Sequence, residues 1–491
     1  MKAYWKKAAT VLLAAVLLFA AAACGDPDKG KGGVIKYAEK FPDDFNEEFL
    51  IKNTADFNYG ERDGGKRALY LVERLKKVYY RDYADFPWRL SYYRESGRNS
   101  YLWDFGALHS MANAVYKANR GSEDARKLVE DLCGDVEAYK SGANSRIVDE
   151  VLWKEDVPGN MLPNDFVRLA KKIMKIKEET YDDGQGGSYT VGRMPVRIYN
   201  SSVGSGDPYY DDNVWIVMSL LESGLMLGDA GWIGNAEAAL MYVLSGWTGG
   251  AGGGLLWKES YNTKNTCSNG PSAMACVMFH NYYKDLASKA DGEERLEYEE
   301  KSGFYLGFAE YIYAWTKEIL CDPIDGVYDD HIILDDNGSS FRISRGKLTY
   351  NAGTMLSAAV RLFEATGKTA YKEDALKTVK GSYQYFVTRD RLFVPGLDIY
   401  PTSDGWFHVY LVQGYLDVAR VLGEDGYLEK MRDTMDYAYK NARNYYGLIK
   451  NDWSGRDISP DAQYAYAELR NAAAPIEVIA LIAAYYMDKA F

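Results

Sequence analysis

The sequence predicts an all-α protein made of helical hairpins, and three observations support this fold class. Apolar residues recur at helical spacing along most of the 491-residue chain, whereas alternating patterns typical of strands are few. A turn motif, in which a helix end, a glycine and a polar residue precede an aromatic residue, recurs between the helical segments. The distances between its copies vary. A solenoid would repeat more regularly, so the variation favours a closed barrel of inner and outer helices with its site on one face.

The first 24 residues precede this helical body and follow a different plan. Lys2, Lys6 and Lys7 come before an apolar run that ends at residue 23, as in a secretory signal. Cys24 follows three alanines, a context similar to the cleavage box of bacterial lipoproteins. We expect a signal peptide over residues 1–23, a membrane anchor through lipid on Cys24, and export to the cell surface or periplasm. A secreted protein with an incidental cysteine is the alternative.

Residues 24–45 are expected to form a flexible tether, because their first part is rich in Gly, Asp and Lys. The remaining residues, 46–491, are expected to form a single helical domain. Thirteen segments in it have helical periodicity. These segments lie near residues 67–82, 100–119, 122–138, 163–180, 212–227, 232–246, 269–288, 296–320, 350–366, 371–388, 406–422, 427–443 and 473–489.

The composition excludes several function classes. With 58 Lys and Arg against 70 Asp and Glu, and no basic cluster, the chain is not expected to bind nucleic acid. The four histidines and the four cysteines after Cys24 are dispersed, without the spacing of a zinc site, and no phosphate loop or nucleophile elbow is present. We therefore expect no metal, no cofactor and a monomer. One or two disulfides remain open, because spacing alone cannot pair the cysteines.

The turn motif has three clear copies. Its glycine is expected to adopt the left-handed conformation that ends a helix, and its aromatic residue to anchor the next helix. The glycine and aromatic pairs are Gly228 with Trp232, Gly367 with Tyr371, and Gly423 with Tyr427, and fainter copies begin at Gly121 and Gly292.

The first helix of each hairpin begins with polar and aromatic residues. If these helices form the inner ring, their N-termini converge at one end of the barrel and line a shared cleft there. Aromatic rings stack on sugar surfaces, and amides bind sugar hydroxyls. These helix starts lie at residues 101–104, 210–213, 268–270, 349–353 and 404–406.

Asp211 and Asp212 begin one of these helices and are the candidate catalytic residues. Glycoside hydrolysis uses two carboxyl groups, about 5 Å apart in retaining enzymes and roughly 6.5–9.5 Å apart in inverting ones. Adjacent residues have Cα atoms about 3.8 Å apart, so their side chains reach the retaining distance easily. Taken alone, the pair could also be an acidic first helical turn that complements the helix dipole.

Four motifs in series resemble glycoside hydrolase family 76, the endo-α-1,6-mannanases, over roughly residues 60–490. A further segment, 326–330, also has the family's pattern. The motifs are Asp211-Asp212-Asn213-x-Trp215, Gly253-Gly254-Leu255-Leu256-Trp257-Lys258, Lys264-Asn265-x-x-Ser268-Asn269-Gly270-Pro271 and Thr349-Tyr350-Asn351-x-Gly353.

The resemblance implies an (α/α)6 barrel and a retaining, metal-free hydrolysis of α-mannan backbones. Asp211 would be the nucleophile. Asp212 would be the general acid/base, and its pKa has to be held apart from that of its neighbour by its surroundings. The residues expected to contact α-mannan or manno-oligosaccharides are Trp103, Asp104, Tyr210, Asn213, Trp257, Lys258, Asn265, Asn269, Tyr350, Asn351 and Trp406.

Other functions remain open at this stage. The chain could be another (α/α)6-barrel glycosidase, such as an unsaturated glycuronidase, or a transglycosylase that passes the retained intermediate to a sugar. It could also be a surface lipoprotein that binds glycan without cleaving it. The stretch 139–207 looks longer than expected for the family and could reshape one end of the cleft. Two Asp-Asp pairs followed by glycine, at 182–183 and 335–336, are expected to be turns.

Overall fold

The computed structural model describes residues 61–81, 86–89, 99–335, 338, 340–457 and 468–489. The predicted signal peptide, Cys24 and the tether lie outside the described residues and stay predictions. Phe57–Phe491 form one compact unit, and helices dominate the described part of it.

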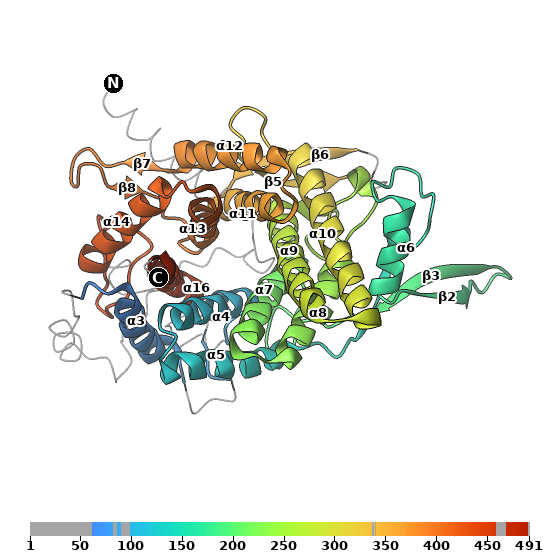
Figure 1. The fold of residues 1–491 in the computed structure, drawn as a ribbon, viewed down its shortest axis with the longest axis horizontal. Coiled ribbons are helices and arrows are strands. Elements are labelled where there is room, and N and C mark those ends of the chain that lie inside the picture. The colour runs from blue at the N-terminus through green and yellow to red at the C-terminus, as the bar shows by residue number, and fades with distance from the viewer. Residues whose placement is uncertain are drawn as a thin grey trace, which may run out of the picture. The chain divides into compact units, whose positions relative to one another are not determined.

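Six helices form a closed inner ring (Figure 1). Each packs against the next in chain order, and the last returns to contact the first. The ring consists of α4 (Leu102–Ala118), α7 (Tyr210–Leu227), α9 (Thr266–Lys289), α11 (Thr349–Thr366), α13 (Phe407–Asp417) and α16 (Leu469–Lys489).

Six outer helices alternate with the inner ones along the chain, and each packs against an inner neighbour. A further helix, α6 (Asn164–Ile173), packs against α10 outside the ring. The predicted (α/α)6 barrel is confirmed, and each of the thirteen predicted helices has a counterpart. The outer helices are α3 (Gly64–Tyr79), α5 (Glu123–Asp135), α8 (Ala230–Leu244), α10 (Gly292–Leu320), α12 (Thr369–Phe386) and α14 (Gly426–Asn441).

The clear copies of the turn motif behave as predicted. Gly228, Gly367 and Gly423 follow the last helical residue with φ of 70°, 71° and 75°, a left-handed conformation that side chains disfavour. Tyr371 donates a hydrogen bond to Glu310 of the neighbouring outer helix. At the faint copy, Gly292 also takes a left-handed φ of 58°, but it begins α10 and does not end α9, whose C-cap is Ala290.

Three small sheets interrupt the helices. The first, in the order β1-β3-β2, contains β1 (Ser145–Val148), β2 (Lys177–Asp182) and β3 (Ser188–Pro195). The second contains β4 (Thr263–Asn265), β5 (Asp329–Leu334) and β6 (Phe341–Lys347), and the third contains β7 (Thr388–Arg389) and β8 (Asp398–Ile399). Short 3-10 segments lie at Val136–Tyr139, Glu150–Leu152 and Gly250–Gly252, and a π-helical turn at Val418–Leu422 extends α13.

The first sheet corrects one prediction. The helix expected over 163–180 ends at Ile173, Lys175 takes a positive φ of 53°, and the chain then pairs as β2. The Asp-Asp pair at 182–183 lies at the hairpin turn between β2 and β3, as expected. Asp183 accepts hydrogen bonds from the backbone N–H groups of Gln185 and Gly187 there.

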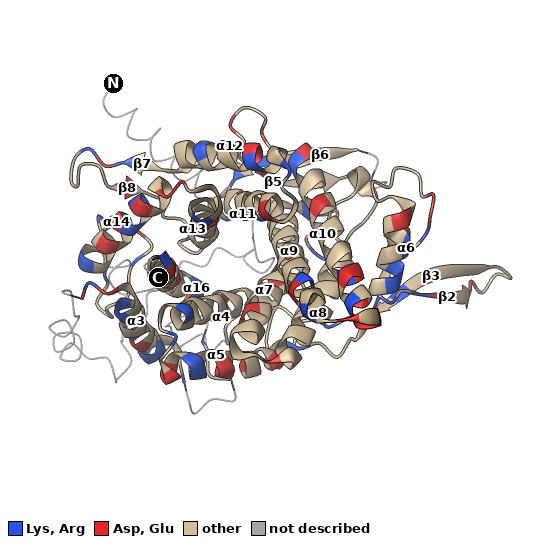
Figure 2. Ribbon diagram, in the orientation of Figure 1, with Lys and Arg blue, Asp and Glu red and all other residues tan. Residues whose placement is uncertain are grey.

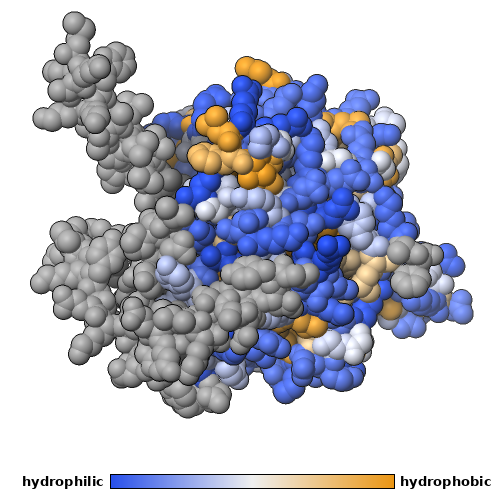
Figure 3. Space-filling model, turned by 90° about the vertical axis from the view of Figure 1, so that its left-hand side faces the viewer, coloured by the Kyte–Doolittle hydropathy of each residue, from blue (hydrophilic) through white to orange (hydrophobic). Residues whose placement is uncertain are grey.

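The four cysteines Cys133, Cys267, Cys276 and Cys321 are free thiols. Within the described residues no helix is long and apolar enough to cross a membrane, and no group of three or more His, Cys, Asp or Glu is arranged to hold a metal ion. Figure 3 shows one side of the protein, which is mainly hydrophilic with separate apolar patches.

Candidate active site

Asp211 and Asp212 lie in the first turn of inner helix α7. The loop that precedes β4 holds this helix start in place, because Tyr210 N–H donates to the Trp257 carbonyl at 3.0 Å and Tyr209 pairs with Lys258. Both aspartates remain partly exposed, although the residues around them are buried. Solvent therefore reaches the two carboxyl groups, although most of the residues around them are buried.

Asp211 receives three hydrogen bonds. Trp257 Nε1–H donates to its Oδ2 at 2.9 Å, and Cys267 Sγ–H of α9 donates to the same oxygen at 3.3 Å. The backbone N–H of Asp212 donates to its Oδ1 at 2.9 Å. Burial raises the pKa of Asp211 to about 6, and these donors oppose the increase because they stabilise the carboxylate.

Asp212 has a different environment. Its side chain receives no hydrogen bond within the described residues, and it lies near the charges of Asp211 and Asp104. Burial first, and then these two carboxylates, raise its pKa well above the ordinary value, while Arg470 opposes the rise. The structure thus places a hydrogen-bonded carboxyl group beside one that favours its protonated form.

Arg470 of α16 joins three helix starts of the ring. Its guanidinium binds Asp104 Oδ1 at 3.0 Å and Asp404 Oδ2 at 3.1 Å, and it also pairs with Glu468. It lies over the Trp103 ring, 4.1 Å from the centroid. Burial raises the pKa of Asp104 to about 6, and Arg470 limits that rise. The positive charge of Arg470 also opposes the rise in the pKa of Asp212.

The side-chain amides of Asn213 and Asn269 form hydrogen bonds with backbone groups. Asn213 accepts from Tyr199 N–H at 2.8 Å and donates to the Tyr199 carbonyl at 2.9 Å. Asn269 does the same with Leu255, at 2.8 and 3.1 Å. Each amide also donates to the carbonyl four residues earlier. Both were expected to bind substrate, but the structure places them as clamps that tie the incoming chain to the helix start.

The glycine-rich loop before Trp257 is held by hydrogen bonds from a buried lysine. Lys264 is buried, and its Nζ donates to the carbonyls of Thr248 and Gly250 at 2.8 and 2.6 Å, and also to that of Gly253. Burial lowers the pKa of Lys264 to about 7. This side chain therefore fixes the loop that carries the tryptophan donor of Asp211.

A second polar cluster lies at the start of α11. Asn351 Nδ2–H donates to Asp330 Oδ1 at 3.0 Å, and His331 Nδ1 lies 2.8 Å from Asp330 Oδ2. Asn265 pairs with His331 between β4 and β5, and its buried Oδ1 has no hydrogen-bond partner among the described residues. Asn265 and Asn351, both expected to contact substrate, therefore share one cluster.

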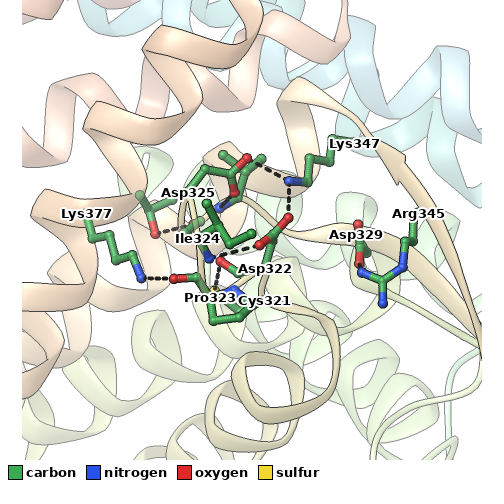
Figure 4. A network of polar contacts seen from close by, with 12 residues as sticks. Cys321, Asp322, Pro323, Ile324, Asp325, Asp329, Arg345, Lys347 and Lys377 are labelled. Carbon is green, nitrogen blue, oxygen red and sulfur yellow. Dashed lines mark hydrogen bonds and ion pairs between the residues drawn. The ribbon is translucent and has the colours of Figure 1, made fainter.

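The strand that carries Asp330 is fixed by ion pairs outside the ring. Figure 4 shows Lys347 between Asp322 and Asp325, at 2.7 Å from each, and Arg345 beside Asp329 at 3.3 Å. These contacts join both ends of the turn before β5 to β6.

The aromatic residues at the helix starts form one stacked group. Trp103 packs edge-on against Trp406 with centroids 5.4 Å apart, and Tyr350 stacks on Phe407 at 4.3 Å. Trp103 is partly exposed, whereas Tyr350 and Trp406 are buried and support it from below.

Two of the expected contact residues lie away from this group. Tyr210 is buried against Tyr242 of α8, with ring centroids 4.8 Å apart. Lys258 pairs with Asp207 and lies over the rings of Tyr209 and Tyr261.

Sequence reasoning missed Cys267, Asp404, Arg470 and the Asp330–His331 pair as members of the site. Asp404 and Cys267 stand at helix starts, which was the available signal. Arg470 carries no motif and reaches the site only because α16 closes the ring.

Two concentric rings of helices, with carboxyl and aromatic groups gathered at the inner N-termini, define a barrel of the glycoside hydrolase class. The sequence pattern of glycosyl hydrolase family 76 matches residues 175–478, and the chain belongs to this family. The match includes the Asp pair, the amide clamps and Arg470.

Solved structures confirm the fold. A family 76 glycoside hydrolase from a bovine Bacteroides thetaiotaomicron strain superposes with a TM-score of 0.66 at 21% identity, over 87% of this chain and 78% of that one. A family 76 mannosidase from Bacteroides thetaiotaomicron gives 0.67 at 18%, over 87% of this chain and 100% of that one. An inactive α-1,6-mannanase of Salegentibacter, with two consecutive aspartates replaced by asparagine and α-1,6-mannotriose bound, gives 0.58 at 19%, over 86% and 100%.

Curated relatives match over shorter stretches of this chain. A mannan endo-1,6-alpha-mannosidase of Candida glabrata is 30% identical over 144 residues, which is 28% of each chain. A putative mannan endo-1,6-alpha-mannosidase of Schizosaccharomyces pombe is 24% identical over 261 residues, which is 50% of this chain and 53% of the relative. The chain thus spans about half or less of the length of these curated relatives.

Proposed function

We propose that this protein is a retaining, endo-acting α-1,6-mannanase that hydrolyses α-mannan backbones with Asp211 and Asp212. The observation that carries the proposal is the difference between the two adjacent carboxyl groups. Asp211 receives three hydrogen bonds, whereas Asp212 receives none within the described residues and lies between two other carboxylates. Two carboxyl groups whose surroundings separate their pKa values can divide the roles of nucleophile and acid/base.

In this proposal Asp211 attacks the anomeric carbon, because its hydrogen bonds stabilise the carboxylate form. Asp212, kept protonated by burial and neighbouring charge, donates its proton to the leaving oxygen. It then accepts a proton from the water that hydrolyses the glycosyl–Asp211 ester. Arg470 keeps the Asp104 carboxyl from adding its full charge to Asp212.

Family membership and the names of the relatives support the substrate. Both curated relatives are named as mannan endo-1,6-alpha-mannosidases, and one related structure holds α-1,6-mannotriose. The partly exposed Trp103 and Trp257 are positioned to stack on sugar rings beside the carboxyl pair. Export and lipid attachment at Cys24 complete the proposal, so that the enzyme would act on extracellular polysaccharide.

The first test is product analysis on debranched α-1,6-mannan with the wild type, Asp211→Asn and Asp212→Asn. We expect short manno-oligosaccharides of retained anomeric configuration from the wild type, and a loss of at least about 10³-fold in kcat for each variant. Saturable binding of mannan without products would instead support the glycan-capture function. Transfer of the cut chain to an added sugar acceptor would identify a transglycosylase.

The assignment of roles can be tested through Trp257→Phe. The phenylalanine keeps an aromatic ring but removes the N–H donor to Asp211, so the pKa of that carboxyl rises and less of it is ionised at low pH. We expect kcat/KM to fall by about 10- to 100-fold, and the acid limb of its pH profile to move to higher pH. A fall in rate with an unmoved acid limb would contradict the role given to Asp211.

A further inference from the structure

The sheet β1-β3-β2 lies outside the barrel and has one covered and one open face. On the covered face Val148 and Met194 are buried, and Gly192 lies so close to Trp153 that a Cβ would come within 2.6 Å of its ring. Lys171 of α6 pairs with Glu178 on the same side. Figure 1 shows the β2–β3 hairpin extending beyond α6.

The open face carries aromatic and apolar side chains in alternation with charged ones. Tyr181 pairs directly with Tyr189 across the strands, and Arg193 pairs with Ile147. Since alternate residues of a strand share a face, these side chains lie on the same side of the sheet. Tyr181, Tyr189 and Ile147 are 38%, 54% and 46% exposed.

The two tyrosines are held in a fixed arrangement with polar neighbours. Their rings stack with centroids 5.7 Å apart and planes 23° apart. Arg193 donates to Glu179 Oε2 at 2.7 Å and to the Tyr181 hydroxyl at 3.2 Å, and that hydroxyl donates to Glu179 at 2.5 Å. The Arg193 and Glu179 charges offset each other, and Lys177, which pairs with Arg193 across the strands, adds one positive charge to this face.

The sheet is joined to the loop that carries Trp257. Arg146 of β1 binds Glu259 at 2.7 Å, and Glu259 is two residues from Trp257, the donor to Asp211. The sheet is therefore connected, from its covered face, through this ion pair to the loop of the candidate active site.

We propose that this open face is a second glycan-binding surface, which holds a stretch of the same neutral polysaccharide away from the cleavage site. Paired aromatic rings suit the C–H faces of pyranose sugars, and the adjacent Arg, Glu and phenol groups suit their hydroxyls. This inference rests on the proposed function for the identity of the polysaccharide.

The test uses the full chain with Tyr181→Thr and Tyr189→Thr combined. Threonine keeps a high strand propensity, so the hairpin is retained while both rings are removed. We expect the affinity for debranched α-1,6-mannan, measured by retardation in gels containing the polymer, to fall about tenfold. The kcat/KM on the polymer should fall several-fold, while kcat/KM on α-1,6-mannotetraose should stay unchanged.

Two further variants control for folding and for loss of any exposed tyrosine. The pair Tyr181→Phe and Tyr189→Phe keeps the stacked rings and should bind mannan nearly as the wild type does. Tyr385→Thr removes a tyrosine that is 55% exposed on α12, and should leave mannan binding unchanged.

The outcomes separate this inference from the proposed function. Undiminished mannan retardation of the threonine pair, or a wild type that mannan does not retard, overturns the second surface whatever the activity. An equal loss on mannotetraose also overturns it, because the effect would then act through the active site. If the wild type cleaves neither substrate but the threonine pair still weakens retardation, the surface stands and the proposed catalysis fails.

Discussion

Helices α11 and α12 are neighbours of equal length, 18 residues each, and yet they are stabilised differently. Thirteen residues of α11 are buried but only six of α12, because α11 lies in the inner ring between α9, α13 and its outer partner. Figure 2 shows the same contrast in charge, with Lys, Arg, Asp and Glu along α12 and few on α11.

The inner helices are sensitive to volume because they approach one another at small residues. A Cβ added to Gly270 of α9 would lie 2.5 Å from Thr354 Oγ1 of α11, and one added to Gly414 of α13 would lie 2.7 Å from Leu356. In the outer helices the constraint depends on the position: an added Cβ would meet nothing within 4 Å at Gly234 or Gly303, but at Gly381 of α12 it would collide with the Asp325 carbonyl. The contrast predicts that equal substitutions have unequal effects in the two rings.

The largest effect is expected for glycine to alanine changes. At Gly353 of α11 a Cβ would collide with the backbone of Tyr410 and Leu411, so we expect Gly353→Ala to lower the free energy of unfolding by about 3 kcal/mol or more. Gly303→Ala, on exposed α10, should raise it by about 0.5–1 kcal/mol through helix propensity. Denaturant unfolding of both variants measures the difference, and similar changes would contradict the contrast.

A smaller effect is expected inside the ring at Glu477 of α16. This side chain is 1% exposed and accepts a hydrogen bond from Ser110 at 2.5 Å. Burial raises the pKa of Glu477 to about 8, and the charge of Glu222 adds to the rise while Lys117 opposes it. The native state therefore keeps a proton that the unfolded chain loses at lower pH.

The stabilising contribution of that proton is present below the ordinary carboxyl pKa and is lost as pH rises toward 8. We expect Glu477→Gln, which cannot ionise, to gain stability relative to the wild type progressively as the pH rises from about 5 to 8. Thermal or denaturant unfolding across this range measures the gain. Parallel curves for the two proteins would show that Glu477 titrates as an exposed group does.

The smallest effect is expected for ion pairs on the outer ring. Arg295→Ala removes an exposed pair with Glu299 on α10 and should leave the stability without a measurable change. Arg361→Ala, on α11, removes one of the two cationic partners of Asp417 on α13, a carboxylate whose side chain is only 8% exposed, and leaves Arg420 at 3.5 Å. We expect it to cost about 1–2 kcal/mol, and an equally neutral result would weaken the comparison.

Most of the barrel could be predicted because each helix has its own periodicity and turn signals. Strand β2 could not, since its sequence, Lys177–Asp182, is polar throughout and becomes a strand only by pairing with β3. The site residues that the sequence did not predict were missed for the same reason, because their contacts form only in the folded chain. Arg470 reaches Asp104 across 366 residues of sequence, a contact made only by ring closure.

The orientation of the amides also lay beyond the sequence. Asn213 and Asn269 stand beside the candidate catalytic and contact residues in the motifs, and an amide suits a sugar hydroxyl as well as a peptide group. Only the position of Tyr199 and Leu255 shows that the backbone takes these bonds. The motifs therefore located the candidate site, but they did not distinguish residues that could contact a ligand from residues that bind the backbone.

The clamp at Asn213 has a consequence for how this protein can diversify. The segment that includes the projecting sheet is closed at its base, where Lys140 pairs with Tyr199 and Asn200 N–H donates to the Tyr139 carbonyl at 2.8 Å. Asn213 then grips Tyr199 itself. The hairpin beyond that base can therefore change in length or sequence without moving the start of α7, where the two aspartates lie.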